Sequence, residues 1–156
     1  MNKIFNTIPV RKPKKNLFDL SHEVKMSMKM GYLVPFMCNE VVPGDKFRVS
    51  SEIMMRLAPL VSPVMHRVNV YTHFFFVPNR LIWDEWETFI TGGPSGTSQP
   101  IFPTISPTAS DARFAQGTLP DYFGYPQIPA GVVTGDIKVS ALPLRAYAEI
   151  YNENLS

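Results

Sequence analysis

The chain has 156 residues, of which 45% are apolar and 18% charged, a composition typical of a globular protein and not of a disordered one. Its 15 prolines are nearly twice the usual share of about 5%, which disfavours long helices because proline lacks a backbone donor. The single cysteine, Cys38, excludes an internal disulfide framework and a multi-cysteine zinc site. We expect a chain of strands and loops, without a secretory signal or membrane span, that assembles in a reducing compartment.

The first element is a basic N-terminal arm over residues 1–20. Residues 1–16 contain five basic and no acidic residues, and the remaining 140 contain ten basic and 13 acidic ones, so the net charge of +2 divides into +5 and −3. Two interpretations stay open: a solvated, disordered terminus, or an arm that neutralises the phosphates of a nucleic acid. The candidate DNA-contacting residues are Arg11, Lys12, Lys14 and Lys15.

Three stretches then alternate between apolar and polar side chains, the pattern of a strand with one buried face. They cover residues 24–38, 46–57 and 64–77. The first carries methionines on its apolar face, which fits either ordinary core filling or a contact between subunits. A turn is predicted at Val42-Pro43-Gly44-Asp45, because proline presets one backbone angle and glycine accepts a positive one.

Two helices are predicted after the strands. The first has Asn79 as its N-cap, apolar residues at three- and four-residue spacing, and an end at Gly92-Gly93. The second is capped by Ser140 and has Pro143 in its first turn. Between them, 21 of the 40 residues at 92–131 are Gly, Pro, Ser or Thr. Aromatic side chains are spread through this stretch, so we expect a long loop that docks on something.

These elements do not complete a fold. Three long strands, with a short fourth at 132–139, present an apolar face that needs a second sheet, and residues 94–156 do not supply one. Either another chain supplies that sheet, or the sequence is the front part of a longer protein.

No pattern points to catalysis or to a cofactor. Phosphate-loop, nucleophile-elbow and zinc-protease motifs are absent from the sequence. His66 and His73 have opposite parity on one predicted strand, so they cannot share a metal ion through local geometry. Cys38 has no histidine near it in sequence, and the acidic residues of the first predicted helix have no paired base or nucleophile. We expect no enzyme activity, no cofactor and no metal site.

Two blocks of residues resemble one protein family. The first block lies within residues 21–93 and consists of Ser21-His22-Glu23-Val24-Lys25, Leu33-Val34-Pro35, Glu40-Val41-Val42-Pro43-Gly44-Asp45-Lys46-Phe47, Met65-His66-Arg67-Val68-Asn69-Val70-Tyr71-Thr72-His73, Phe75-Phe76-Val77-Pro78-Asn79-Arg80, Trp83 and Phe89-Ile90-Thr91-Gly92-Gly93. The second consists of Ser140-Ala141-Leu142-Pro143-Leu144-Arg145-Ala146-Tyr147 and Tyr151-Asn152-Glu153. Both blocks are similar to the major capsid protein of the Microviridae, small single-stranded DNA phages, in its gokushovirus-like branch. Their order and length make the resemblance specific.

The resemblance implies a mainly β fold, a viral jelly-roll β-sandwich with long loops and two short helices. Family members are several times longer, so we expect residues 21–156 to be an incomplete, N-terminal part of that domain, with the long loop at 92–131. The implied function is that of a structural major capsid protein that self-assembles into the icosahedral shell of a small single-stranded DNA bacteriophage. The implied partners are copies of itself, minor virion proteins and the genomic single-stranded DNA, without a membrane. The implied location is the virion, assembled in the host bacterial cytoplasm.

A function of another class stays open beside it. A stand-alone jelly-roll binding module would recognise a carbohydrate or peptide through its loops, and the aromatic cluster of Tyr122, Phe123 and Tyr125 would support that hypothesis. Oligomeric state separates the two functions, because a lectin-like module stays small in size-exclusion chromatography.

Overall fold

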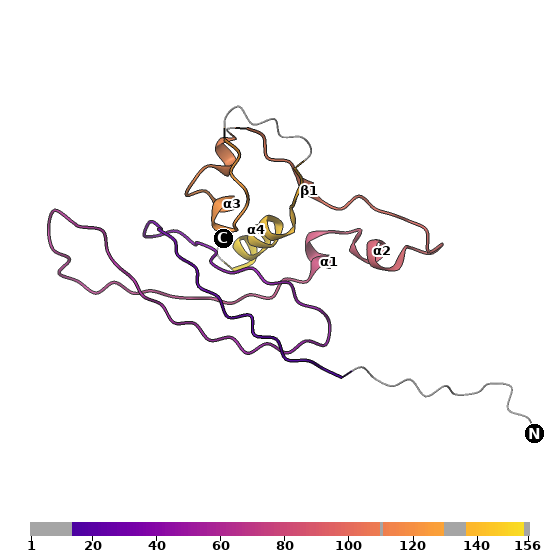
Figure 1. The fold of residues 1–156 in the computed structure, drawn as a ribbon, viewed down its shortest axis with the longest axis horizontal. Coiled ribbons are helices and arrows are strands. Elements are labelled where there is room, and N and C mark those ends of the chain that lie inside the picture. Colours follow the sequence, from indigo (N-terminus) through magenta and orange to yellow (C-terminus); the bar gives the residue numbers. More distant parts are fainter. Residues whose placement is uncertain (1–13, 110, 130–136, 155–156) are drawn as a thin grey trace, which may run out of the picture.

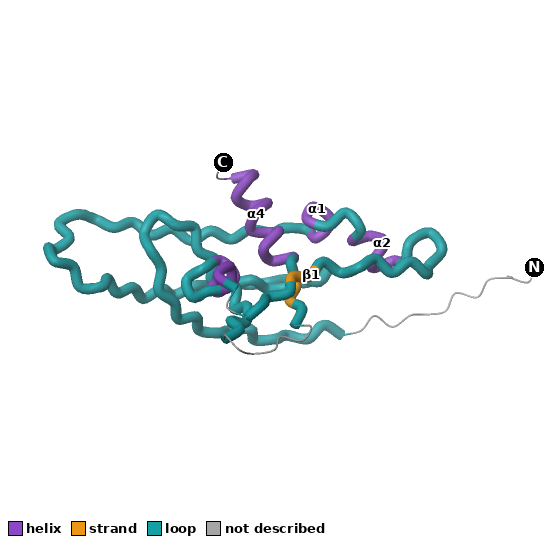
Figure 2. The backbone as a smooth tube through the Cα atoms, turned by 90° about the horizontal axis from the view of Figure 1, so that it is seen from above, coloured by secondary structure: helices purple, strands orange, loops and turns teal. Residues whose placement is uncertain are grey.

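The computed structural model describes residues 14–109, 111–129 and 137–154. Residues 14–77 run back and forth along the long axis of the molecule as extended chain, drawn from indigo to magenta in Figure 1. A smaller body of short helices and one short strand pair lies against them, and Figure 2 shows how much of the backbone is irregular. The predicted arm falls mostly on residues outside the described part of the chain; its Lys14 and Lys15 lie inside it.

The expected mainly β jelly-roll sandwich is wrong for the described residues. Their only strands are β1 (Thr104–Ile105) and β2 (Val139–Ser140), which pair antiparallel with Thr104 opposite Ser140 and Ile105 opposite Val139. The alternating stretches at 24–38, 46–57 and 64–77 are extended but form no ladder with one another. Alternation specifies which side chains share a face, whereas a strand also needs a neighbouring backbone about 4.8 Å away. The proposed fourth strand at 132–139 lies mainly on residues outside the described ranges.

Two glycine turns connect the extended stretches. The predicted turn at Val42–Asp45 is confirmed: the Asp45 N–H donates to the Val42 carbonyl at 3.0 Å, and Gly44 has φ +92°. A second turn at Met30–Gly31, with Gly31 at φ +82°, divides the first predicted strand. Glycine adopts this left-handed conformation without the Cβ penalty, so the chain reverses where the apolar alternation alone predicts a continuous strand.

The first predicted helix is two helices, α1 (Asn79–Ile82) and α2 (Trp86–Thr91). The break falls at Trp83, whose backbone is extended with φ −152°. Its indole is 6% exposed and packs on Phe89 and Phe102, with ring centroids 5.0 and 5.4 Å away. The helix is therefore interrupted at the residue whose side chain enters the core. The predicted end is confirmed, because Gly92 takes the left-handed conformation at φ +78°.

The segment at 92–131 contains short elements between its glycines and prolines. They are β1, the 3-10 turn η1 (Ala112–Phe114) and the one-turn helix α3 (Leu119–Tyr122). Asp111 begins η1: its carboxylate accepts from the Arg113 N–H at 3.0 Å and pairs with the Arg113 guanidinium at 2.7 Å. These hydrogen bonds lower the pKa of Asp111 and keep the exposed turn closed.

The last helix, α4 (Leu142–Asn154), starts where the sequence predicts. The Ser140 hydroxyl accepts from the Leu142 N–H at 3.3 Å, and Pro143 lies in the first turn, where a missing N–H costs nothing. Tyr147 of α4 packs edge-on against Phe123 with ring centroids 6.3 Å apart. The helix therefore joins the segment at 92–131 to the rest of the body.

The molecule has a small core and a large surface. Among the described residues, the buried members of the apolar core are Trp83, Phe114 and Ala141, which are still 4–6% exposed. The chain exposes 14482 Å², whereas a compact monomer of 17.6 kDa exposes about 8,000 Å². The extended stretches, whose large apolar side chains are exposed, contribute to this difference of roughly 6,500 Å². This surface is where the molecule's interactions must be sought.

Candidate interaction surface

The extended stretches keep their apolar faces uncovered. Along residues 46–57 the apolar side chains of one parity are all about half exposed: Phe47, Val49, Ile53, Met55 and Leu57. The same holds for much of the stretches on either side of it, at Val24, Met28, Val68, Val70 and Phe74. Monomeric soluble proteins rarely expose apolar surface on this scale, and larger patches mark interaction sites. We call this set of side chains the apolar face.

Tyrosine hydroxyls tie the first stretch to the body. The Tyr122 hydroxyl donates to the Ser27 carbonyl and the Tyr147 hydroxyl to the Leu33 carbonyl, both at 2.8 Å. Burial raises the pKa of Tyr147, so the hydroxyl keeps its proton and remains a donor through the neutral range. The two bonds lie on either side of the Met30–Gly31 turn and therefore hold both arms of that hairpin-like reversal.

A third tyrosine hydrogen bond lies within the body itself. The Tyr125 hydroxyl donates to the Ser140 carbonyl at the end of β2, and burial raises the pKa of Tyr125. The Phe123 ring meets Tyr125 and Tyr147, so this aromatic cluster is engaged within the chain. Tyr122, Phe123 and Tyr125 are each partly exposed, and their ring and hydroxyl contacts lie within the chain. The sequence alone identifies these rings but not their partners, which lie in distant segments.

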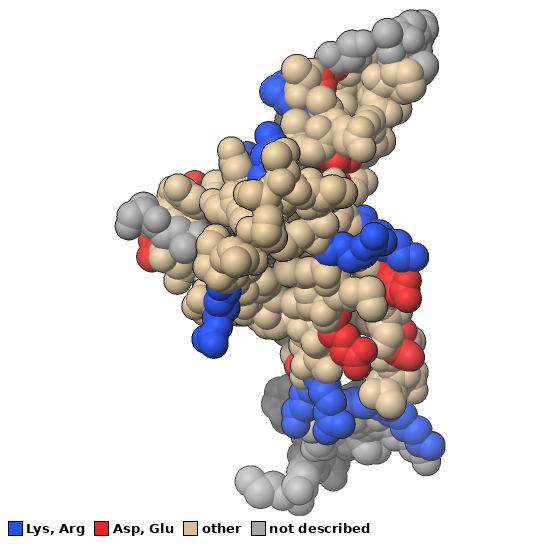
Figure 3. Space-filling view, turned by 90° about the vertical axis from the view of Figure 1, so that its left-hand side faces the viewer, with Lys and Arg blue, Asp and Glu red and all other residues tan. Residues whose placement is uncertain are grey.

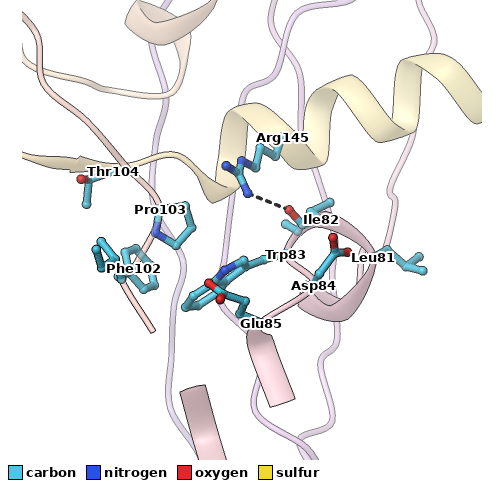
Figure 4. Close-up of a pocket in the computed structure, with 10 residues that line it drawn as sticks. Leu81, Ile82, Trp83, Asp84, Glu85, Phe102, Pro103, Thr104 and Arg145 are labelled. Atoms are coloured by element: carbon cyan, nitrogen blue, oxygen red, sulfur yellow. Dashed lines mark hydrogen bonds between the residues drawn. The ribbon is translucent and has the colours of Figure 1, made fainter. Parts of the chain in front are cut away.

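A hollow of about 580 Å³ opens beside Trp83. Figure 4 shows Arg145 entering it from α4, Asp84 and Glu85 from the link between α1 and α2, and Phe102 and Pro103 from the stretch before β1. The Arg145 guanidinium donates to the Ile82 carbonyl at 3.1 Å, which fixes α4 against α1. Nothing in the sequence pattern places these residues together, because they come from three separate segments. The volume lies within the range of small-ligand and side-chain pockets.

Charge is unevenly divided along the chain. Residues 1–77 contain eleven basic and five acidic residues, and residues 78–156 contain four basic and eight acidic ones. Figure 3 shows one face of the molecule, a mostly uncharged surface on which Lys and Arg lie in several separate groups, some of them directly beside Asp and Glu. Of the candidate DNA-contacting residues, Lys14 and Lys15 are exposed, while Arg11 and Lys12 lie outside the described residues. Their role in DNA binding stays a prediction.

In the described part of the chain, no three His, Cys, Asp or Glu side chains gather as metal ligands. The imidazole of His66 meets the neighbouring Arg67 carbonyl, at 3.3 Å. Partial desolvation raises the pKa of the Cys38 thiol, with a smaller contribution from the charge of Glu40. A raised pKa keeps the sulfur as an unreactive thiol. No described helix has the length and apolar character to cross a bilayer.

Capsid proteins of phages and of a Spiroplasma virus are similar to the chain. A family model described as "Capsid protein (F protein)" matches residues 6–155. The chain is 41% identical over 159 residues to "Capsid protein VP1" of Chlamydia phage 1, in an alignment that covers 98% of the chain and 26% of that protein. It is 36% identical over 151 residues to "Capsid protein VP1" of Bdellovibrio phage phiMH2K, covering 96% and 27%. With "Capsid protein VP1" of Spiroplasma virus 4 it shares 28% identity, over 86% of the chain and 24% of that protein.

The chain therefore spans about a quarter of the length of the curated relatives it matches. No solved structure matches it.

Proposed function

The chain belongs to the capsid protein (F protein) family, and from this we propose that it builds the shell of a small single-stranded DNA bacteriophage. In this proposal it contributes to a structural major capsid protein, which self-assembles into an icosahedral shell and is located in the virion. Assembly takes place in the host bacterial cytoplasm. The role is that of a contact surface, without enzyme activity.

The excess of exposed surface supports the proposal most directly. The chain exposes roughly 6,500 Å² more than a compact monomer of its mass. One partner contributes about 800 Å² to a standard protein–protein interface, so the excess of this single chain is larger than one such contact covers. The apolar face is the part of it that gains most from being covered, because burial of apolar area is the main favourable term in association. Other copies of the same protein are the partners that a shell supplies.

The genomic single-stranded DNA and minor virion proteins are further proposed partners. Lys14 and Lys15 are exposed, and among the described residues neither has a carboxylate partner. Together with Arg11 and Lys12 they make a short cationic segment of the kind that neutralises phosphates.

Negative-stain microscopy tests the shell. We expect the natural gene product that carries these residues to form closed particles. The variant Val49→Asp places a charge on the apolar face, where Val49 is 52% exposed in the single chain, and should abolish the particles. Ser50→Asp adds the same charge at the neighbouring exposed position of opposite parity and serves as the control. A gene product that stays monomeric at high concentration contradicts the proposal. If both variants assemble equally well, the apolar face is not the surface through which the copies associate.

A further inference from the structure

We propose that the hollow beside Trp83 docks residues 14–20 of a second copy of the chain. The inference rests on the proposed function, because an assembly is what brings a second copy to this site. It adds a specific contact that joins the basic N-terminal end of one copy to the acidic link between α1 and α2 of its neighbour.

The hollow has an apolar wall with nothing covering it. Ile101 is 89% exposed and Leu81 57% exposed, although both line a concave site beside the buried Trp83 ring. Phe102 and Pro103 complete this wall in Figure 4. The hollow is open to solvent and combines this apolar wall with a polar rim, and its volume has room for large side chains.

The rim of the hollow carries negative charge. Asp84 and Glu85 line it, and Glu87 follows one turn-length further along the chain; all three are exposed. Within the described ranges the ion pairs join Lys25 to Glu23 and Arg113 to Asp111, so these three carboxylates have no cation partner there. Arg145, the one cation of the lining, is held by the Ile82 carbonyl. The site therefore suits a cationic segment that also carries large apolar side chains.

Residues 14–20 have that composition in that order. Lys14 and Lys15 are exposed cations, and Leu17 and Phe18, 100% and 76% exposed, follow them directly. Neither apolar side chain is buried against its own molecule. A cationic pair for the rim and an apolar pair for the wall match the two properties of the hollow, and charge complementarity of this kind fixes the register of a contact.

The occupant comes from a second copy and not from the same molecule. In Figures 1 and 2 alike, the described N-terminal end lies away from α1 and α2. Residues 14–20 are exposed throughout, so they can meet the hollow of a neighbouring copy without moving within their own molecule.

A charge-exchange experiment tests the contact. One variant of the chain carries Lys14→Glu with Lys15→Glu, and the other carries Asp84→Lys with Glu85→Lys. In sedimentation velocity each variant alone should associate about tenfold more weakly than the unchanged chain, because like charges then face each other. A one-to-one mixture should restore association, since the acidic arm of the first variant meets the basic hollow of the second. The double change Glu40→Lys with Glu153→Lys, at two exposed carboxylates outside the hollow, is the control and should have no such effect.

A peptide probe separates this contact from association through the apolar face. A fluorescein-labelled peptide of residues 14–20 should raise its anisotropy with the unchanged chain and not with the Asp84→Lys, Glu85→Lys variant. All four changed side chains are exposed, and far-UV circular dichroism verifies that the helices persist. Equal peptide binding by both chains, or a mixture that fails to restore association, overturns the inference. If particles form but the mixture does not restore association, this contact is refuted and the proposed function is not.

Discussion

The hydrogen bond from Tyr147 to Leu33 provides a sharp test of how the first extended stretch is held. Tyr147→Phe removes the hydroxyl that donates to the Leu33 carbonyl at 2.8 Å and keeps the ring that packs on Phe123. A partly buried neutral hydrogen bond contributes about 1 kcal/mol, which is about a fivefold change in the equilibrium between docked and undocked chain. Lys29 lies between the two tethered carbonyls of Ser27 and Leu33.

Limited trypsin digestion followed by mass spectrometry measures this change. When opening and closing are faster than cleavage, the cleavage rate follows the population of the open form, so cutting after Lys29 should accelerate about fivefold. Tyr151→Phe, one turn further along α4, is the matched control, because Tyr151 is 49% exposed and its hydroxyl makes no hydrogen bond within the described residues. Cutting after Arg48, on an untethered stretch, is the internal reference. Equal acceleration at Lys29 and Arg48, or equal rates in both variants, would refute the tether.

Three further outcomes follow from the same structure. Burial raises the pKa of Tyr125 and Tyr147 above their ordinary value near 10, so their stabilisation should be complete below pH 10 and disappear as the pH rises past it. Circular dichroism should show this alkaline loss diminished in a Tyr125→Phe, Tyr147→Phe chain, and an identical pH profile would contradict it. Gly92→Ala should destabilise more than Gly96→Ala in urea titrations, because a Cβ at Gly92 would lie 2.8 Å from the Gly96 backbone while one at Gly96 meets open space; equal midpoints would contradict this. Replacing Arg11, Lys12, Lys14 and Lys15 with alanine should weaken the binding of single-stranded DNA. The slope of log binding constant against log salt concentration should fall by about 0.7 for each phosphate contact removed, and an unchanged slope would assign the arm to another role.

Features that depend on a few neighbouring residues could be predicted from the sequence. The turn at Val42–Asp45, the helix end at Gly92 and the start of α4 at Ser140 are all confirmed. Each depends on the backbone freedom of glycine, the fixed angle of proline or a side-chain cap, and all of these act within four residues. The local signals of this chain are therefore consistent with the structure it adopts.

Features that depend on distant partners could not be predicted. The alternation at 46–57 identifies the side chains that share a face, but strand pairing depends on a neighbour that the pattern does not specify. The helical spacing around Trp83 likewise predicts one helix, whereas packing of its indole on Phe102, 19 residues on, accompanies a break. The hollow combines Arg145 with Asp84 and Glu85, about 60 residues apart, and no motif announces that combination.

Substitutions in the small core and substitutions on the apolar face should have different effects. Trp83 and Tyr147 make their contacts within one molecule, so their replacement changes the stability of the single chain. Val49 is half exposed there, so an aspartate in its place should change single-chain stability by no more than about 0.5 kcal/mol. The same aspartate would be desolvated once a neighbour covers the apolar face, and an unpaired buried charge opposes association strongly. Because binding of a partner stabilises the folded form by mass action, the proposed association predicts that the stability of this molecule rises with the concentration of its copies. Under that proposal, contacts between copies constrain the residues of the apolar face, whereas contacts within one chain constrain the residues around Trp83.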